Sequence, residues 1–202
     1  MDLALDRARE ALEAGEFPVA CLLVDDAGRL LATGARERTA QGPAGELWHA
    51  EMTALARLEE FWSREAPGSI TAYCTMEPCL MCLGALIIHG ITRVVYALED
   101  VMGGGTSVDL ASLPPLYRDS GLSVTGGVKR ERSLALFQAF FRAYSRSAAS
   151  SPSISPSPLT SPSAFSSPLK FQSIPALWLA PRQPNESSRY RLGDWAMSAS
   201  RR

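Results

Sequence analysis

Two cysteines and one histidine are of types and spacing that could hold a metal ion. Cys79 and Cys82 are separated by two residues, which on a helix places their sulfurs about one turn apart. A helix N-terminus also lowers a thiol pKa towards the thiolate that zinc requires. His49, at the start of the preceding helical pattern, can be the third ligand. Three protein ligands leave one position for water, which is typical of a catalytic rather than a structural zinc site.

Glu51 follows two residues after His49 and supplies a carboxylate to the same place. In the first turn of a helix, this carboxylate can face the zinc-bound water while the imidazole holds the metal. Zinc lowers the pKa of bound water to about 7, so Glu51 can take that proton and return it to the substrate and its leaving group. The pattern predicts a hydrolytic zinc enzyme with Glu51 as the proton shuttle.

Each residue also has a structural interpretation when taken alone. The cysteine pair could be half of a structural zinc site or a redox pair, and Glu51 could be a solvated carboxylate that suits a helix N-terminus. The combination with His49 favours the catalytic centre. His89, at the end of the cysteine helix, is predicted to be a capping or surface residue, because a fourth ligand would block the water position.

Three side chains close to His49 in the sequence keep two interpretations each. Trp48 could stack on a substrate base or plug the edge of the core. Arg36 and Arg38, in the loop ahead of the His49 helix, could be solvated charges or ligands of a phosphate.

Helices and strands alternate along the chain in a way that predicts a sheet between helical layers. Apolar residues recur at helical spacing before Gly15, and Pro78 marks the start of the cysteine helix. Phe137, Phe140 and Phe141 form an apolar stripe and are predicted to be core residues. The predicted strands are 17–24, 29–34, 70–75, 93–98 and 122–125; the predicted helices are 3–12, 49–58, 79–88, a short one after 105, and 129–144.

Composition divides the 202 residues into a folded domain, 1–145, and a tail, 146–202. Residues 147–168 are rich in serine and proline, which predicts a disordered linker. Residues 1–144 hold 13 basic and 19 acidic residues, a net charge of −6, and the remainder has a net charge of +5. An acidic domain weighs against tight, sequence-independent binding of polyanions.

The chain carries no pattern of a secreted or membrane protein. No stretch approaches the roughly 18 apolar residues of a membrane span, and the opening residues lack an apolar core of signal-peptide length. We therefore expect a soluble cytoplasmic protein with reduced cysteines. Cys21 and Cys74 lie inside apolar runs and are predicted to be core residues.

The order His-x-Glu and then Pro-Cys-x-x-Cys is the signature of zinc deaminases that act on nucleobases. Residues 75–85, Thr-Met-Glu-Pro-Cys-Leu-Met-Cys-Leu-Gly-Ala, closely resemble the bacterial tRNA adenosine deaminases and their relatives in the cytidine/deoxycytidylate deaminase superfamily. Residues 16–20, 93–96 and 136–144 are similar too, so the resemblance covers about residues 3–144. It implies an α/β protein with a three-layer α/β/α cytidine-deaminase-like fold and a mixed five-stranded sheet.

The resemblance also implies one Zn²⁺ per chain, a nucleobase-containing substrate and a homodimer. We expect substrate contacts at Trp48, Ala50, Pro78 and Arg36. Many family members carry a substrate-contacting asparagine in or just after the second strand, where this chain reads Gly-Ala-Arg-Glu-Arg over residues 34–38.

Three functions stay open from the sequence. The first is adenosine-to-inosine deamination in tRNA, favoured by the resemblance. The second is deamination of a free base, nucleoside or nucleotide of the guanine, cytosine, cytidine or deoxycytidylate type. This function suits the acidic domain, because a small substrate needs no extended positively charged surface. The third is a catalytically inactive zinc-binding partner module, against which Glu51 argues.

Overall fold

The computed structural model describes residues 1–39, 47–61 and 68–150. Helices and strands alternate through these ranges as the sequence predicts. Their bounds, in chain order, are α1 Asp2–Glu13, β1 Ala20–Asp25, β2 Leu30–Ala35, α2 Ala50–Phe61, β3 Ile70–Met76, α3 Leu80–Ile88, β4 Arg93–Leu98, the 3₁₀ turn η2 Leu110–Ser112, α4 Pro115–Arg118, β5 Ser123–Thr125 and α5 Arg130–Ser150.

The five strands form one mixed sheet in the order β2-β1-β3-β4-β5. Strand β1 runs antiparallel to both β2 and β3, whereas β4 runs parallel to β3 and to β5. The β1–β2 hairpin closes through Asp25, whose carboxylate accepts hydrogen bonds from the backbone and side chain of Arg29, with Gly28 at a φ of +78°. Parallel β3 and β4 require a crossover, which is α3.

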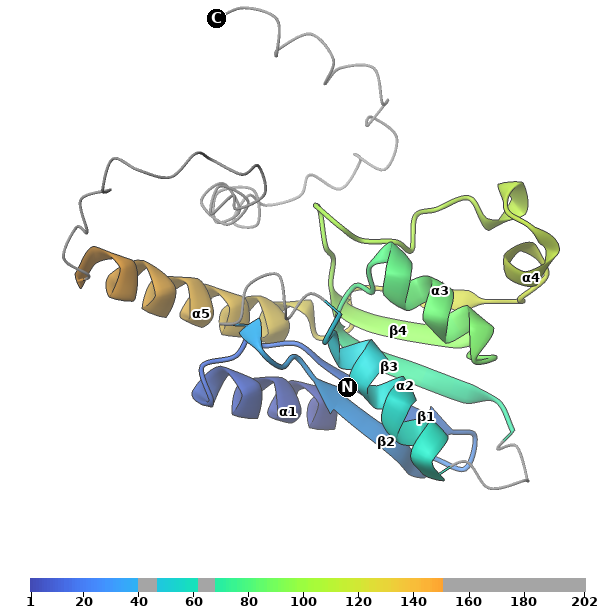
Figure 1. Ribbon diagram of the computed structural model, residues 1–202, viewed down its shortest axis with the longest axis horizontal. Helices are drawn as coiled ribbons and strands as arrows, with labels where there is room; N and C mark the ends of the chain where they lie inside the picture. The colour runs from blue at the N-terminus through green and yellow to red at the C-terminus, as the bar shows by residue number, and fades with distance from the viewer. Residues whose placement is uncertain (40–46, 62–67, 151–202) are drawn as a thin grey trace, which may run out of the picture. The chain divides into compact units, whose positions relative to one another are not determined.

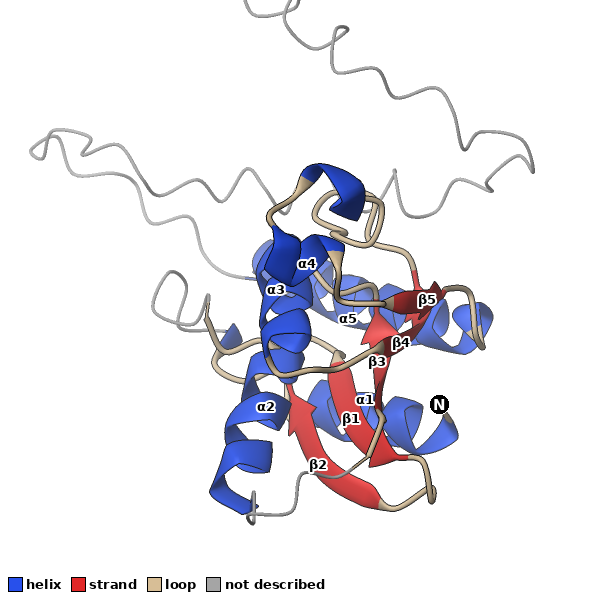
Figure 2. Ribbon diagram, turned by 90° about the vertical axis from the view of Figure 1, so that its right-hand side faces the viewer, coloured by secondary structure: helices blue, strands red, loops and turns tan. Residues whose placement is uncertain are grey.

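Helices cover both faces of this sheet. Helices α2 and α3 pack together on one face, with α2 against β1 and β2, whereas α1 and α5 pack together on the other face against β1, β3 and β4. Figures 1 and 2 show the two helical layers with the strands between them. The predicted three-layer α/β/α fold with a mixed five-stranded sheet is confirmed.

The core lies in the two spaces between sheet and helices. Cys21 and Cys74 are fully buried at paired positions of β1 and β3, as predicted, with their sulfurs 3.8 Å apart. Phe137 is buried as predicted, but Phe140 and Phe141 are only half-buried. They form an edge-to-face cluster with Phe17 at the margin of the sheet, because α5 extends beyond the strands there.

Most predicted boundaries shift by one to three residues in the structure, and the end of α5 shifts by six. Strand β1 begins at Ala20 rather than at residue 17, because Pro18 has no N–H and Val19 N donates to Phe17 O, so neither residue can donate a hydrogen bond to a neighbouring strand. Helix α5 continues to Ser150, past the predicted domain end at 145. The predicted tail lies mostly outside the described residues, and that boundary stays a prediction. No helix within the described ranges is long and apolar enough to cross a membrane.

The first turn of α2 lies directly on β2 at Gly34. A Cβ atom built on Gly34 would lie 2.0 Å from Ala50 O and 2.6 Å from Ala54 N, both backbone atoms of α2. Only glycine therefore permits this approach of helix and strand.

We expect Gly34→Ala to lower the free energy of unfolding by at least about 2 kcal/mol, because the added methyl group forces α2 away from β2. Gly84→Ala is the matched control, since a Cβ there meets only Tyr117 Cε1 at 3.9 Å and alanine favours the helix. Urea unfolding of the two variants measures the difference. Equal stability of the two variants would contradict the close approach.

Candidate zinc centre

The starts of helices α2 and α3 bring the predicted ligands together. His49 directly precedes α2, and its carbonyl accepts the hydrogen bond from Thr53 N at 2.9 Å. Cys79 is the N-cap of α3, with extended φ and ψ, and Cys82 lies in the first turn. Each ligand is therefore held by the backbone of a helix N-terminus, where the positive end of the helix dipole favours a thiolate.

The three ligand atoms fit one zinc ion. Nδ1 of His49 lies 3.6 Å from Cys79 Sγ and 3.4 Å from Cys82 Sγ, and all three ligand atoms lie within 4.8 Å of one another. Zinc with bonds of about 2.0–2.3 Å gives tetrahedron edges of about 3.3–3.8 Å, close to the observed separations. Two sulfurs and one imidazole also match the donor preference of zinc.

Charges within the cluster distinguish its two thiols. A hydrogen bond with Cys82 and a second one with His49 lower the pKa of Cys79 to about 4. The pKa of Cys82 is raised, mainly by its hydrogen bond with Cys79 and to a lesser extent by burial. The pKa of His49 is raised, chiefly by its hydrogen bond with Cys79. The surroundings of Cys79 thus favour the thiolate form that a metal ion binds.

Glu51 points its carboxyl group into this cluster. The residue is only 3% exposed, and its carboxyl group interacts with His49 and Cys79 by charge and with Cys82 by a hydrogen bond. Burial raises the pKa of this carboxyl group. A buried carboxyl group beside three ligand atoms is placed to exchange protons with whatever occupies the fourth position.

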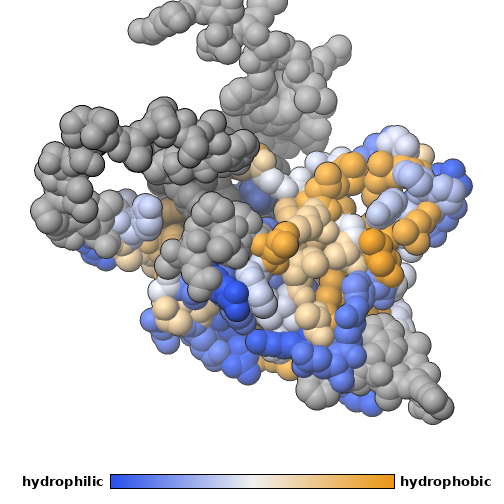
Figure 3. All heavy atoms as spheres, viewed as in Figure 1, coloured by the Kyte–Doolittle hydropathy of each residue, from blue (hydrophilic) through white to orange (hydrophobic). Residues whose placement is uncertain are grey.

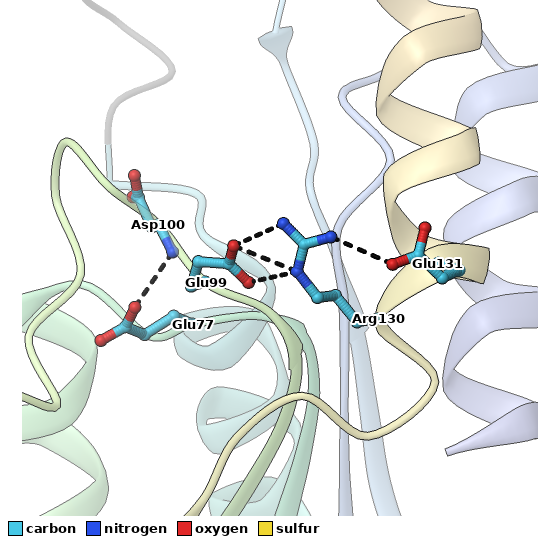
Figure 4. Close-up of polar contacts among 5 residues, drawn as sticks. All are labelled: Glu77, Glu99, Asp100, Arg130 and Glu131. Atoms are coloured by element: carbon cyan, nitrogen blue, oxygen red, sulfur yellow. Dashed lines mark hydrogen bonds and ion pairs between the residues drawn. The ribbon is translucent and has the colours of Figure 1, made fainter. Parts of the chain in front are cut away.

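Glu77, which sequence reasoning missed, fixes the loop that covers the start of α3. Its carboxylate accepts hydrogen bonds from Asp100 N at 3.0 Å and Thr106 N at 3.2 Å, and the adjoining Gly105 N donates to Pro78 O. Figure 4 shows that the neighbouring Glu99 points the other way, to Arg130 of α5. The end of β4 is thereby tied to both helical layers.

The residues predicted to contact substrate lie around the cluster in different settings. Trp48 is 39% exposed, which argues against the core interpretation, and the guanidinium of Arg38 lies 4.0 Å above its ring. Ala50 and Pro78 are buried. Arg36 is half-buried just after β2. Their contacts with substrate stay predictions.

His89 takes no part in the cluster. It ends α3, where its Nδ1 lies 2.9 Å from Ala85 O and its Nε2 lies 2.7 Å from a carboxylate oxygen of Glu59 in α2. It therefore bridges the two helices as a capping residue, as predicted.

Comparison with known proteins agrees with this geometry. Residues 1–98 match the family profile of the cytidine and deoxycytidylate deaminase zinc-binding region. The chain is 31% identical to tRNA-specific adenosine deaminase 2 of Xenopus tropicalis, over 75% of this chain and 92% of that protein. It is 32% identical to the tRNA-specific adenosine deaminase of Agrobacterium fabrum, over 70% and 91% of the two chains. The chain belongs to the cytidine and deoxycytidylate deaminase family.

A solved relative of this deaminase shares the fold. The structure comes from studies of A-to-I editing by tRNA deaminases at the wobble position of transfer RNA. It is 32% identical, with a TM-score of 0.51, over 63% of this chain and 95% of the other. The deaminase is thus a zinc-dependent hydrolytic enzyme, as the signature predicts.

We expect Cys82→Ala to lose the bound zinc of this deaminase, because two ligands hold the ion far more weakly than three. Cys74→Ala is the matched control, since both residues are 0% exposed but Cys74 lies outside the ligand cluster. Zinc per chain after dialysis, measured by mass spectrometry, separates them. Full zinc content in Cys82→Ala would contradict the ligand assignment.

Proposed function

We propose that this deaminase converts adenosine to inosine in tRNA, with His49, Cys79 and Cys82 as zinc ligands and Glu51 as the proton shuttle. The observation that carries the proposal is the buried Glu51 carboxyl group beside a set of three ligand atoms. Three ligands leave room for a water molecule, and the buried carboxyl group of Glu51, which interacts with the ligand residues themselves, lies next to that room.

The reaction replaces the amino group of the base by oxygen from water and releases ammonia. Zinc, when bound, supplies the Lewis acidity that makes water a nucleophile near neutral pH. Glu51 accepts a proton from the attacking water, gives it to the ring nitrogen, and carries the second proton to the leaving amino group. Burial keeps bulk water away from these transfers and strengthens the interaction of Glu51 with His49 and the cysteines.

The names of the relatives support tRNA as the substrate. The proteins from Xenopus tropicalis and Agrobacterium fabrum are both tRNA-specific adenosine deaminases, and this chain spans about nine tenths of each. A tRNA substrate is consistent with a location in the cytoplasm, which cell fractionation tests.

A deaminase of a free base, nucleoside or nucleotide is the second candidate. The net charge of −6 over residues 1–144 favours it, because a small substrate needs no track of positive charge. An inactive zinc-binding module is a third, and the placement of Glu51 opposes it.

Glu51→Gln is expected to lower ammonia release by about 10²- to 10⁴-fold while zinc content stays at the wild-type level, because the amide cannot shuttle a proton. The substrates are tRNA anticodon stem-loops, nucleotides, nucleosides and free bases. Glu59→Gln, an exposed carboxylate on the same helix, is the control and should keep full activity. Wild-type activity in Glu51→Gln would sink the mechanism, and activity on small molecules alone would favour the second candidate.

We further propose that the protein forms a homodimer through an apolar surface over α3 and the chain that follows β4. Figure 3 shows apolar side chains gathered over this part of the described domain. The exposed members of this surface are Leu80, Met81, Ile88, Val101, Met102 and Leu116. An exposed patch of this kind is typical of a protein interface.

Sedimentation of the full chain should give the mass of a dimer, and Ile88→Lys should shift it to a monomer, because a charge in an apolar interface is costly. Leu3→Lys, an exposed leucine on α1, should leave the dimer intact. A monomeric wild-type protein at micromolar concentration contradicts this proposal.

A further inference from the structure

Arg36 is held by the backbone in a fixed position next to the metal cluster. Its N–H donates to Val19 O at 2.8 Å, so the residue continues the pairing of β2 with the chain before β1. Side chains alternate along extended chain, so Arg36 projects on the same side as Gly34, two residues earlier. That side faces α2, because the Gly34 position touches Ala50 O and Ala54 N.

Contacts on either side of Arg36 place it beside His49. Gly34 touches Ala50, the residue after His49, and Glu37 N donates to the carbonyl of Trp48, the residue before it, at 3.4 Å.

The nearby carboxylates are engaged elsewhere. Glu37 forms its ion pair with Arg57 at 3.2 Å. Glu16 accepts the backbone N–H groups of Arg38 and Thr39. Within residues 1–39, 47–61 and 68–150, the half-buried guanidinium of Arg36 makes no ion pair or hydrogen bond.

A half-buried guanidinium that makes no ion pair or hydrogen bond with the described residues leaves its N–H donors available for an anion. We infer that Arg36 binds a phosphate group attached to the nucleoside that is deaminated, so that the enzyme selects a nucleotide unit over a free base or nucleoside. The inference rests on the proposed deaminase function of the same site. A guanidinium offers two parallel N–H donors, which match two phosphate oxygens.

The rim next to Arg36 suits the same ligand. The guanidinium of Arg38 lies 4.0 Å over the ring of Trp48 and adds a second positive charge on the approach to the cluster. Trp48 is 39% exposed, so an aromatic edge borders the same approach. Phosphate next to base is the chemistry of a nucleotide unit, whether it stands in RNA or free in solution.

The test compares wild type with Arg36→Ala and Arg36→Lys in the zinc-loaded full chain. The substrates are an anticodon stem-loop, the same stem-loop with methylphosphonates flanking the target adenosine, adenosine monophosphate, and adenosine. Arg93→Ala is the matched control, because Arg93 is an exposed arginine at the start of β4, the end of the sheet opposite the metal cluster.

We expect Arg36→Ala to raise the KM for the phosphate-bearing substrate about tenfold or more, with a smaller effect for Arg36→Lys and none for Arg93→Ala. The methylphosphonate stem-loop should raise the KM of wild type by the same factor and should not raise the KM of Arg36→Ala any further, because the two changes remove the same interaction. Binding gives an independent readout: the slope of log K against log salt for the stem-loop should fall by about 0.7 in Arg36→Ala. An effect on the stem-loop alone assigns the phosphate to RNA, and one on adenosine monophosphate assigns it to a free nucleotide.

Three results would overturn the role of Arg36 even if the enzyme deaminates its substrate. The effects of Arg36→Ala and of methylphosphonates on KM could add independently, the salt slope could stay unchanged, or Arg36→Ala could raise the KM for adenosine as much as the KM for the phosphate-bearing substrate. If wild type releases no ammonia from any substrate, the proposed function fails, and the salt slope alone decides whether Arg36 binds phosphate.

Discussion

The structure depends on one constraint: the three proposed ligand atoms, which come from the starts of two different helices, must lie close enough together for one coordination sphere. His49 stands before α2, and Cys79 and Cys82 stand at the start of α3, so the two helices have to begin at the same edge of the sheet. The strand order meets this need. The chain enters α2 from β2 and α3 from β3, and both strands run antiparallel to β1, which lies between them, so both end at the same edge of the sheet. Two helix N-termini then share one site, and both favour the thiolates that a metal ion requires.

Other features of the fold follow from holding those two helix starts in place. Gly34 lets α2 lie directly on β2, which fixes His49 and the buried Glu51 relative to the sheet. Glu77 gathers the loop after β4 over the start of α3, and the Glu99–Arg130 pair joins the same strand end to α5. The proposed ligands, the Glu51 carboxyl group and Arg36 are thus held in place by the fold itself.

Much of this was predictable from the sequence because the chemistry is local. His49 and Glu51 are two residues apart, and Cys79 and Cys82 are three apart, so the local sequence predicts that each pair lies at the start of a helix. Helix and strand order followed from periodicity. The role of Glu77 could not be predicted, since its partners lie more than twenty residues away. The half-burial of Phe140 and the late start of β1 also depend on packing that no local pattern shows. Arg36 could be singled out, but its orientation required the register of β2 against α2.

The central claim is that the three ligands and Glu51 form a catalytic zinc centre rather than a structural one. The most direct test strips the protein of metal and follows ammonia release from an anticodon stem-loop and from adenosine monophosphate as zinc is returned in small steps. Our account predicts a folded but inactive apoprotein, with activity that rises in proportion to zinc and stops rising at one ion per chain. Activity that is present without metal, or that continues to rise well beyond one ion per chain, would contradict it.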